Sequence, residues 1–341
     1  MTLATIEIDL EYLPTIEGPP VAPLALHKQA ASNDETTVNS WHEIWVRNAK
    51  ANHASHGPFK DSSVGQLFGK FARQPVIVAG SGPSLKRNAH HLVNKGDIPL
   101  VSCLHNFHFF EDRDIPVDFY VSLDAGEITV EEISEGGRLT HQEYLDRTKD
   151  KTLLAFIGTS PKLLEAWQGK VLFFHCPIPH PGIMAEIAAI EEFNTFVSNG
   201  GNVLGACAYI SKAFLGANPV AFIGADFAFS WDKKFHGWKS KYDAQLGHVI
   251  RTLDVFGIKV YTWQSYYNFK CWFDSIACRV PGFWVNCTEG GCFGAYAEGN
   301  IKQVIQMPLE AFITSYRMHE QMREQCLNPA GLDKANISIL F

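Results

Sequence analysis

Short apolar runs rich in β-branched residues recur through the middle of the chain, with roughly 10–20 residues of helical character between them. The first run, Pro75–Ala79, reads Pro-Val-Ile-Val-Ala and has the length of a buried strand. Strands that alternate with helices form βαβ units, whose strands are parallel. The pattern therefore predicts an α/β fold with a mostly parallel sheet flanked by helices. The expected strands are 75–79, 98–103, 119–123, 153–157, 171–174, 219–223 and 259–262.

The remaining sequence predicts helices around this sheet and an irregular start. Residues 1–38 are rich in proline and lack sustained periodicity, which predicts an extended lead-in. Trp41 and Trp45 fit either a homo-oligomer contact or packing within the chain. We expect an extended and helical N-terminal extension (1–72), a central α/β domain (73–270) and a C-terminal lid and helical segment (271–341). The expected helices are 40–54, 62–72, 85–94, 106–112, 200–215, 242–256 and 308–325.

Composition narrows the class of protein. Of the 341 residues, 46% are hydrophobic and 19% are charged, which is the balance of an ordinary globular enzyme. The net charge of -7 argues against nucleic-acid binding through a broad basic face. No apolar run approaches the ~20 residues of a membrane span. The acidic residues of Met1–Glu17 are unlike a secretory signal. We therefore expect a cytoplasmic protein.

Seven of the cysteines fall into two groups. Three lie in apolar stretches and are expected to be buried in the core: Cys103, Cys176 and Cys207. Four others have gaps of six, eight and four residues: Cys271, Cys278, Cys287 and Cys292. A structural zinc site usually contains a tight pair of cysteines, and only the last gap comes near that spacing. The spacing therefore argues against a zinc site, and no metal ligand is assigned.

A glycine-rich turn directly follows the first expected strand. Glycines let the backbone approach a phosphate closely, and the helix that follows presents unpaired N–H groups to an anion. A proline presets φ for the first helical turn, and the final serine adds a hydroxyl donor. These features predict a nucleotide-binding turn, although a tight strand-to-helix connection is the alternative. The turn consists of Gly80, Ser81, Gly82, Pro83 and Ser84.

Three further polar residues follow expected strands. Asn106 comes just past the second strand, Asp124 ends the third, and Asp226 follows the strand 219–223. Ligands of open parallel sheets bind beyond the carboxyl ends of the strands. Each residue alone could be a cap or a turn residue, but together they predict a site at one edge of the sheet.

These motifs resemble two related groups of proteins. The segments Val76–Lys86 (VIVAGSGPSLK), Asn106–Asp112 (NFHFFED) and Val121–Asp124 (VSLD) carry the likeness. One group unites MptE-like 6-hydroxymethylpterin pyrophosphokinases with the motility accessory factors proposed to glycosylate flagellin. The other is the bacterial sialyltransferases of the same Rossmann-like fold. Residues 200–226 resemble the first group's second signature, and Asn286–Gly291 (NCTEGG) resembles its third.

The resemblance covers about residues 62–310 and implies a Rossmann-like nucleotide-binding domain. It implies that Thr288, Glu289 and Gly290 form a loop that closes the pocket. It also implies that Asn106 and Asp124 face the nucleotide or the donor group. The residues placed around the nucleotide are Gly80, Ser81, Gly82, Pro83, Ser84, Asn106, Asp124, Gly200, Gly201, Asn202, Thr288, Glu289 and Gly290.

The likeness to the sialyltransferases implies a general base. In those enzymes a histidine shortly before the last core helix has this role, and His236 falls at about that place. An imidazole can take a proton from an acceptor hydroxyl at neutral pH. The tyrosines that stabilise the leaving phosphate in those enzymes are missing from residues 228–234. Lys233 or Lys234 could neutralise the phosphate instead.

Three functions stay open at this point. The favoured one is a glycosyltransferase that uses a CMP-linked acidic sugar as donor and an unknown acceptor, with His236, Lys234 and Asp226 as catalytic residues and no required cofactor. The second is a pyrophosphokinase, in which Asp124 and Asp226 would hold Mg²⁺ between the phosphates of ATP. The third is a nucleotide-binding module without turnover.

Overall fold

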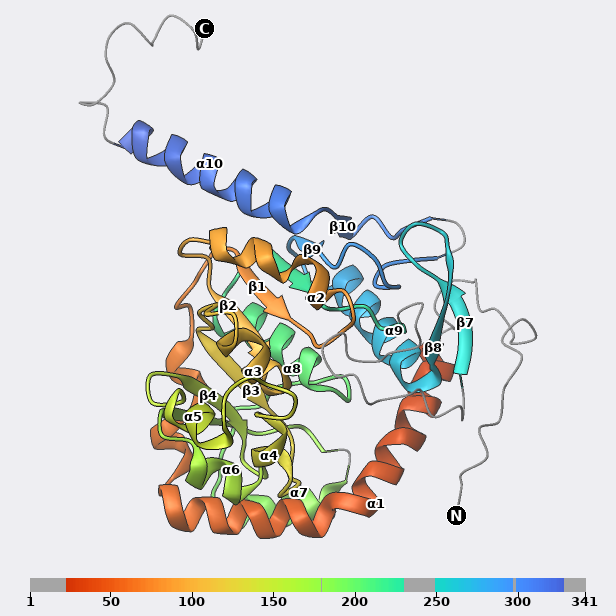
Figure 1. The fold of residues 1–341 in the computed structure, drawn as a ribbon. Helices are drawn as coiled ribbons and strands as arrows, with labels where there is room; N and C mark the ends of the chain where they lie inside the picture. Colours follow the sequence, from red (N-terminus) through yellow and green to blue (C-terminus); the bar gives the residue numbers. More distant parts are fainter. Residues whose placement is uncertain (1–22, 179, 230–248, 297–298, 328–341) are drawn as a thin grey trace, which may run out of the picture.

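The computed structural model describes residues 23–178, 180–229, 249–296 and 299–327. Its centre is an eight-stranded sheet of order β10-β9-β6-β1-β2-β3-β4-β5 (Figure 1). Every neighbouring pair in this sheet is parallel. The predicted α/β fold with a mostly parallel, Rossmann-like sheet is therefore confirmed. The strands are β1 (Val76–Ala79), β2 (Leu100–Cys103), β3 (Phe119–Ser122), β4 (Thr152–Phe156), β5 (Lys170–Phe174), β6 (Val220–Ile223), β9 (Trp284–Asn286) and β10 (Val304–Gln306).

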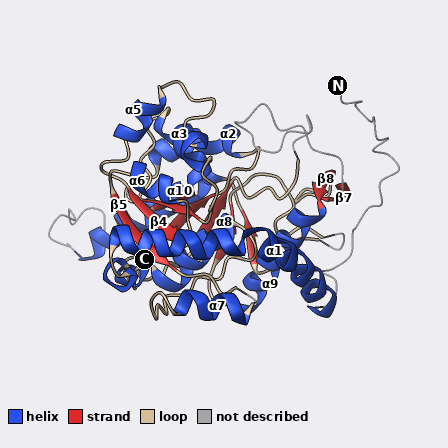
Figure 2. Cartoon of the chain, turned by 90° about the horizontal axis from the view of Figure 1, so that it is seen from below, coloured by secondary structure: helices blue, strands red, loops and turns tan. Residues whose placement is uncertain are grey.

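Helices cover both faces of the sheet (Figure 2). Figure 2 shows α2, α3 and α5 on one face, with α7 and α9 on the other. Short 3₁₀ turns supplement them at η2 (Phe59–Ser62), η3 (Val64–Leu67), η4 (Ala89–Asn94) and η5 (Leu104–Asn106). The helices are α1 (Pro23–His56), α2 (Leu85–Asn88), α3 (Phe107–Glu111), α4 (Thr129–Glu132), α5 (His141–Asp146), α6 (Pro161–Ala166), α7 (Pro181–Ala188), α8 (Val203–Tyr209, continued by a π-helical turn, Ile210–Phe214), α9 (Gln264–Arg279) and α10 (Leu309–Leu327).

Burial on both faces explains why the strands read as continuous apolar runs. All four residues of β1 are fully buried, as are all four of β6. Helices on both sides leave no solvent-facing side chain in these strands, so the alternation of a half-exposed strand is absent. β1 lies between β2 and β6, and the chain order reverses there. This junction is the topological switch point, where open α/β sheets bind ligands.

The N-terminal extension is more helical than the sequence predicts. The expected helix 40–54 is part of α1, but α1 begins at Pro23, so the extended lead-in predicted up to residue 38 is wrong over 23–38. α1 contacts α6, α7 and α9, so tertiary packing stabilises the helix as a whole. Asn48 and Asn52 fix α1 in place. Their buried amides donate to backbone carbonyls of the loops after β3 and β4.

Trp45 agrees with one of the two expected alternatives, whereas the segment that follows α1 differs from expectation. Trp45 packs edge-on against Phe156, with ring centroids 6.3 Å apart, so packing within the chain accounts for it. The helix expected over 62–72 is replaced by the turns η2 and η3 and further turns. Gly69 has φ of +73°, which breaks the helical path of this segment.

A β-hairpin replaces the expected helix 242–256. Residues 242–248 lie outside the described residues, and Val249–Leu253 form β7, which pairs antiparallel with β8 (Lys259–Trp263). The helix prediction is therefore wrong over 249–256. Asp254 sets the turn, because its Oδ1 accepts hydrogen bonds from the backbone N–H groups of Phe256 and Ile258. The strand predicted at 259–262 is present, but it belongs to this hairpin and not to the parallel sheet.

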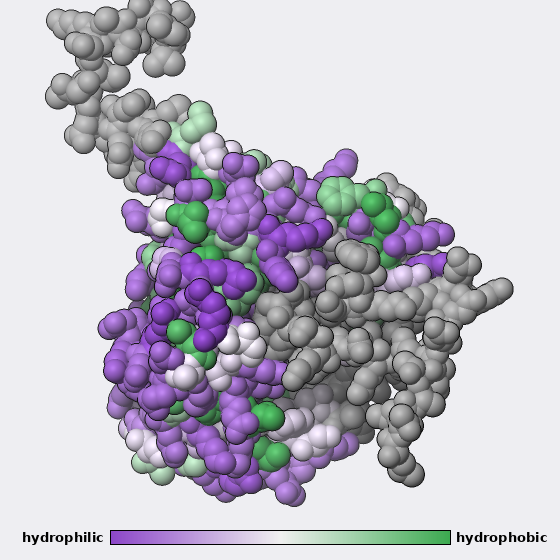
Figure 3. All heavy atoms as spheres, in the orientation of Figure 1, coloured by the Kyte–Doolittle hydropathy of each residue, from purple (hydrophilic) through white to green (hydrophobic). Residues whose placement is uncertain are grey.

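The last part of the chain completes the sheet. α9 spans residue 270, where the sequence analysis places the end of the central domain. After α9, β9 pairs with β6 and β10 pairs with β9. A fully buried ion pair connects α9 to the loop after β9: Lys270 Nζ lies 2.8 Å from Asp274 Oδ2 and donates to the carbonyl of Ala295. The predicted final helix is confirmed as α10, which extends away from the body in Figure 1. The face shown in Figure 3 is largely hydrophilic, with scattered apolar patches.

Candidate functional site

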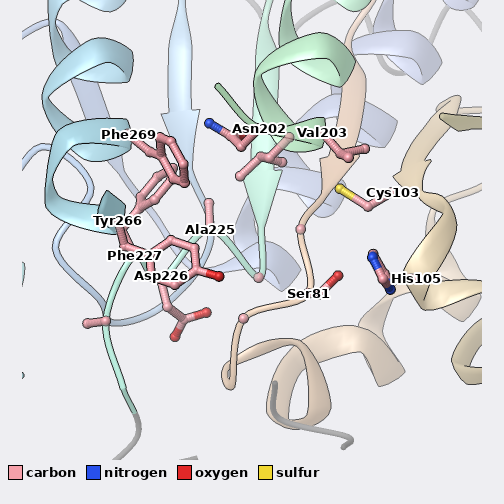
Figure 4. A pocket seen from close by; sticks show the side chains of 15 residues that line it. Ser81, Cys103, His105, Asn202, Val203, Ala225, Asp226, Phe227, Tyr266 and Phe269 are labelled. Atoms are coloured by element: carbon pink, nitrogen blue, oxygen red, sulfur yellow. The ribbon is translucent and has the colours of Figure 1, made fainter. Parts of the chain in front are cut away.

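A cavity of about 250 Å³ opens at the carboxyl ends of β1 and β6 (Figure 4). Several of the predicted strand-end residues meet there, because the strands that carry them are neighbours in the sheet. Aromatic side chains of α9 form one side in Figure 4, and Ser81 and His105 form the other. The lining residues are Gly80, Ser81, Gly82, Cys103, His105, Asn202, Val203, Leu204, Gly224, Ala225, Asp226, Phe227, Ala228, Tyr266 and Phe269.

The glycine turn lines the cavity because the backbones of the two strand ends approach closely. A Cβ at Gly80 would lie 2.4 Å from the carbonyl oxygen of Gly224, and one at Gly82 would lie 2.0 Å from Asp226 Oδ2. Only glycine fits at these two positions. The Gly82 N–H donates to the Gly224 carbonyl at 2.9 Å, so the two strand ends are hydrogen-bonded to each other.

Asp226 is fixed against the start of α2. Its Oδ2 accepts a 2.7 Å hydrogen bond from the Ser84 hydroxyl, and its Oδ1 accepts from the Ser84 backbone N–H at 3.2 Å. Burial raises the pKa of Asp226 to about 6, although the hydrogen bonds from Ser84 oppose this shift. The sequence predicts that Ser84 serves a bound phosphate. In the structure Ser84 is fully buried and serves the protein's own carboxylate.

Asn106 and Asp124 lie beside the cavity and not in its lining. Asn106 is fully buried, and its amide donates to the Gly80 carbonyl at 3.1 Å and to Ser102 Oγ at 3.1 Å. It therefore supports the glycine turn from behind. Asp124 Oδ2 lies 3.6 Å from Nε2 of His105, a lining residue that the sequence analysis did not single out. The histidine adjacent to Asn106 at a strand end was the available signal.

The segment before α8 contributes one polar group to the cavity. Asn202 lines it and also caps α8, since its Oδ1 accepts from the Gly205 N–H at 2.9 Å. Gly200 and Gly201 have φ of +57° and +84°. They pack under aromatic rings of α9, as a Cβ at Gly200 would lie 2.3 Å from the Trp272 ring. Both glycines thus shape the approach of α8 to the cavity.

The predicted closing loop lies behind Asp226. Thr288 is fully buried, and its hydroxyl accepts from the Ala225 N–H at 3.2 Å. The Glu289 carboxylate accepts from the Leu309 N–H at the start of α10. Neither these residues nor Gly290 line the cavity. The loop therefore supports the β6 strand end without lining the cavity.

The aromatic side of the cavity was missed by sequence reasoning. Tyr266 and Phe269 lie one helical turn apart on α9, and their rings are in edge-to-face contact with centroids 5.6 Å apart. Burial raises the pKa of Tyr266, so its phenol stays protonated at neutral pH. The spacing of aromatic residues along a helix was the signal that could have indicated this wall.

Two predicted catalytic residues and the metal question remain. His236 and Lys234 lie outside the described residues. Within the described part of the chain, no group of three or more metal-binding side chains is placed to hold an ion.

The expected burial of Cys103, Cys176 and Cys207 is confirmed, and Cys103 lines the cavity. Of the helices described, none is both long and apolar enough to cross a bilayer.

The fold is that of a Rossmann-like α/β protein, and a cavity lies at its switch point. A family model described as 6-hydroxymethylpterin diphosphokinase MptE-like matches residues 50–232. The chain therefore belongs to this MptE-like family, which confirms the resemblance seen in its motifs.

A solved structure shares the fold. It is the MAf glycosyltransferase from Magnetospirillum magneticum AMB-1, with a TM-score of 0.53 and 15% sequence identity. The match covers 76% of this chain and 41% of that one, so this chain spans less than half of that protein's length. No curated protein matches the sequence.

Proposed function

We propose that this protein is a transferase that binds a nucleotide-activated donor in the cavity and transfers the activated group to a hydroxyl acceptor. The observation that carries the proposal is the construction of the cavity at the switch point. A glycine turn lies at its edge, and Tyr266 and Phe269 face it from the other side. Apolar pockets with a few convergent polar groups are the usual form of small-molecule sites. The membership in the MptE-like family supports a transferase.

The geometry favours a ring on the aromatic side and a phosphate on the opposite side. Aromatic faces pack against the flat rings of nucleobases and the apolar faces of sugars. On the opposite side, Gly80, Ser81 and Gly82 line the cavity where the phosphate would lie. CMP, the nucleotide of the favoured donor, fits this description.

Glycosyl transfer from a CMP-linked acidic sugar is the reaction that we favour. In this scheme His236 accepts the proton of the acceptor hydroxyl, and Lys234 faces the leaving phosphate. Asp226, the third proposed catalytic residue, lines the cavity and holds the strand end after β6 through the hydrogen bonds that it accepts from Ser84.

The family's description supports diphosphate transfer as a second candidate. That reaction would use Mg²⁺ held by Asp124 and Asp226. As placed, the two carboxylates do not fit a shared ion. Both oxygens of Asp226 accept hydrogen bonds from Ser84, and Asp124 faces His105 outside the cavity lining. This arrangement is the reason for favouring glycosyl transfer.

A thermal-shift screen tests the choice. A ligand present at 100 times its Kd stabilises the folded state by about 2.7 kcal/mol. We expect CMP to raise the Tm without metal. Stabilisation by ATP only when Mg²⁺ is present would support diphosphate transfer instead. If no nucleotide raised the Tm, both proposals would fail.

The catalytic assignment has its own test. His236→Ala should reduce turnover by about 10²–10⁴-fold, which is the usual contribution of a general base, and should leave CMP affinity nearly unchanged. Isothermal titration and initial rates measured on the same preparation separate the two effects. Unchanged turnover would remove His236 from the mechanism.

A further inference from the structure

His105 lies on the cavity side opposite Tyr266 and Phe269, with a carboxylate at each ring nitrogen (Figure 4). Its Nε2 is 3.6 Å from Asp124 Oδ2, and its Nδ1 is 3.4 Å from Glu132 Oε2. Three separate elements bring these groups together: η5 after β2, the loop after β3, and the last residue of α4. The histidine side chain is 29% exposed, so it is accessible from the cavity.

Only the imidazolium form of His105 has an N–H group for each of the two carboxylates. In that form His105 is the one cationic side chain among the described residues that line the cavity. The others are glycines, apolar side chains, Ser81, Cys103, Asn202, Tyr266 and the acid Asp226. A donor phosphate that enters the cavity can accept a hydrogen bond from a ring N–H of His105.

The two carboxylates are held differently. Asp124 is the more exposed of the two, with 40% of its side chain accessible against 22% for Glu132. The separation of 3.6 Å between Asp124 and Nε2 is also longer than a charge-assisted hydrogen bond of about 2.7–2.9 Å. Asp124 can therefore turn toward solvent and leave Nε2 to a ligand oxygen. Glu132 is the less exposed of the two and lies 3.4 Å from Nδ1, so it stays beside the ring.

We propose that His105 binds the phosphate of the donor nucleotide, that Glu132 is its positioning residue, and that Asp124 occupies the place of the phosphate oxygen in the free protein. This inference rests on the proposed function. In glycosyl transfer, the bond between the sugar carbon and the phosphate oxygen breaks, and its electron pair stays on that oxygen. His105 donates a hydrogen bond to the phosphate as this charge develops. The acceptor oxygen bonds to the same carbon, and its proton goes to the base.

The test compares a nucleoside with its monophosphate. Isothermal titration of CMP and of cytidine gives the ratio of their two affinities, which measures the contribution of the phosphate. For His105→Ala we expect this ratio to fall by about 10–100-fold, the usual value of a hydrogen bond to a charged group. Cytidine affinity should stay unchanged, and His105→Lys should restore part of the ratio because it keeps the cation.

The two carboxylates should respond in opposite directions. Glu132→Gln should lower the CMP-to-cytidine ratio a few-fold, whereas Asp124→Asn should raise it, because a competitor of the phosphate is removed. His42→Ala is the matched control. His42 lies 3.9 Å from Glu43 and does not line the cavity, so neither affinity should change.

The outcomes separate this inference from the proposed function. If wild-type protein binds CMP more tightly than cytidine and His105→Ala preserves that preference, the role of His105 is wrong and the proposed function stands. An equal loss of both affinities would show a merely structural role and would also overturn the inference. Failure of the wild type to bind CMP, UMP, AMP or GMP would overturn both.

Discussion

On the β6 side of the cavity, Asp226 is buried and both of its carboxylate oxygens accept hydrogen bonds from Ser84. On the β2 side, His105 is partly exposed and lies 3.4 and 3.6 Å from its two carboxylates. The first arrangement has a single geometry, since displacing Asp226 would leave buried donors without partners. The second can exchange one partner for a ligand. The β6 side of the cavity is thus built for stability, and the β2 side is built for recognition. Variants on the β6 side should mainly change the free energy of unfolding, and variants on the β2 side should mainly change ligand affinity.

The largest effect on stability should come from the buried pair that backs the first side. Lys270→Ala leaves Asp274 buried without its cation, and breaking such a pair lowers the free energy of unfolding by about 3–5 kcal/mol. Urea titration measures this loss. Lys162→Ala is the control, because Lys162 pairs with Glu127 at 2.6 Å on the exposed surface and its loss should leave the unfolding midpoint nearly unchanged. Equal effects of the two variants would show that the buried pair of Lys270 and Asp274 contributes no more to stability than a surface ion pair.

Asp226 should make stability depend on pH. Burial raises its pKa from 3.8 to about 6. Between about pH 4 and 6 the folded protein keeps a proton that the unfolded chain has released, so the free energy of unfolding falls as the pH rises. With about 1.36 kcal/mol for each pKa unit, the loss is on the order of 3 kcal/mol by pH 7.

Asp226→Asn cannot ionise and should not show this loss. Its stability relative to wild type should therefore increase by a similar amount between pH 4 and pH 7, as measured by chemical unfolding at several pH values. Parallel profiles for the two proteins would show that Asp226 titrates alike in the folded and unfolded states.

The contact between the two strand ends should give a smaller effect. Gly80→Ala places a methyl group 2.4 Å from the Gly224 carbonyl oxygen, and overpacking of this kind lowers stability by about 1–3 kcal/mol. Gly126→Ala is the matched control, since the nearest atom to its added methyl group belongs to Trp41 at 3.8 Å. Thermal unfolding monitored by circular dichroism compares the two. A tolerated Gly80→Ala would mean that the strand ends can separate.

The smallest effect on stability is expected on the recognition side. His105→Ala and Glu132→Gln should each change the free energy of unfolding by less than about 1 kcal/mol, as for other partly exposed ion pairs. Urea titration of both variants at neutral pH checks this. A loss as large as that of Lys270→Ala would remove the distinction between the two sides of the cavity.

The stability side was easier to predict from sequence than the recognition side. The runs before Gly80 and Gly224 are fully buried strands, so their apolar character and the glycines after them indicated both strand ends. Parallel pairing then implied that these ends meet. The partner of Asp226 could not be predicted, because Ser84 is 142 positions away and its hydroxyl had an equally plausible use at a phosphate.

His105 and the aromatic wall depend on tertiary structure. The carboxylate of Glu132 reaches His105 from α4, and Tyr266 reaches the cavity from a helix that follows an unpredicted hairpin. The helix expected over 249–256 failed because local β-pairing with residues 259–263 outweighed its helical spacing. Neither the group around His105 nor the aromatic wall is marked by a characteristic spacing of residues in the sequence.

The place of β9 in the sheet has a consequence for the making of the protein. β6 ends at Ile223, but the strand that covers its outer edge begins only at Trp284. Until that later strand leaves the ribosome, β6 presents a row of unpaired amides and carbonyls on an entirely apolar strand, which is a template for pairing with another chain. A chain shortened between these two points should therefore self-associate instead of folding into a smaller working unit. Assembly of the cavity therefore depends on a strand that is made well after β6.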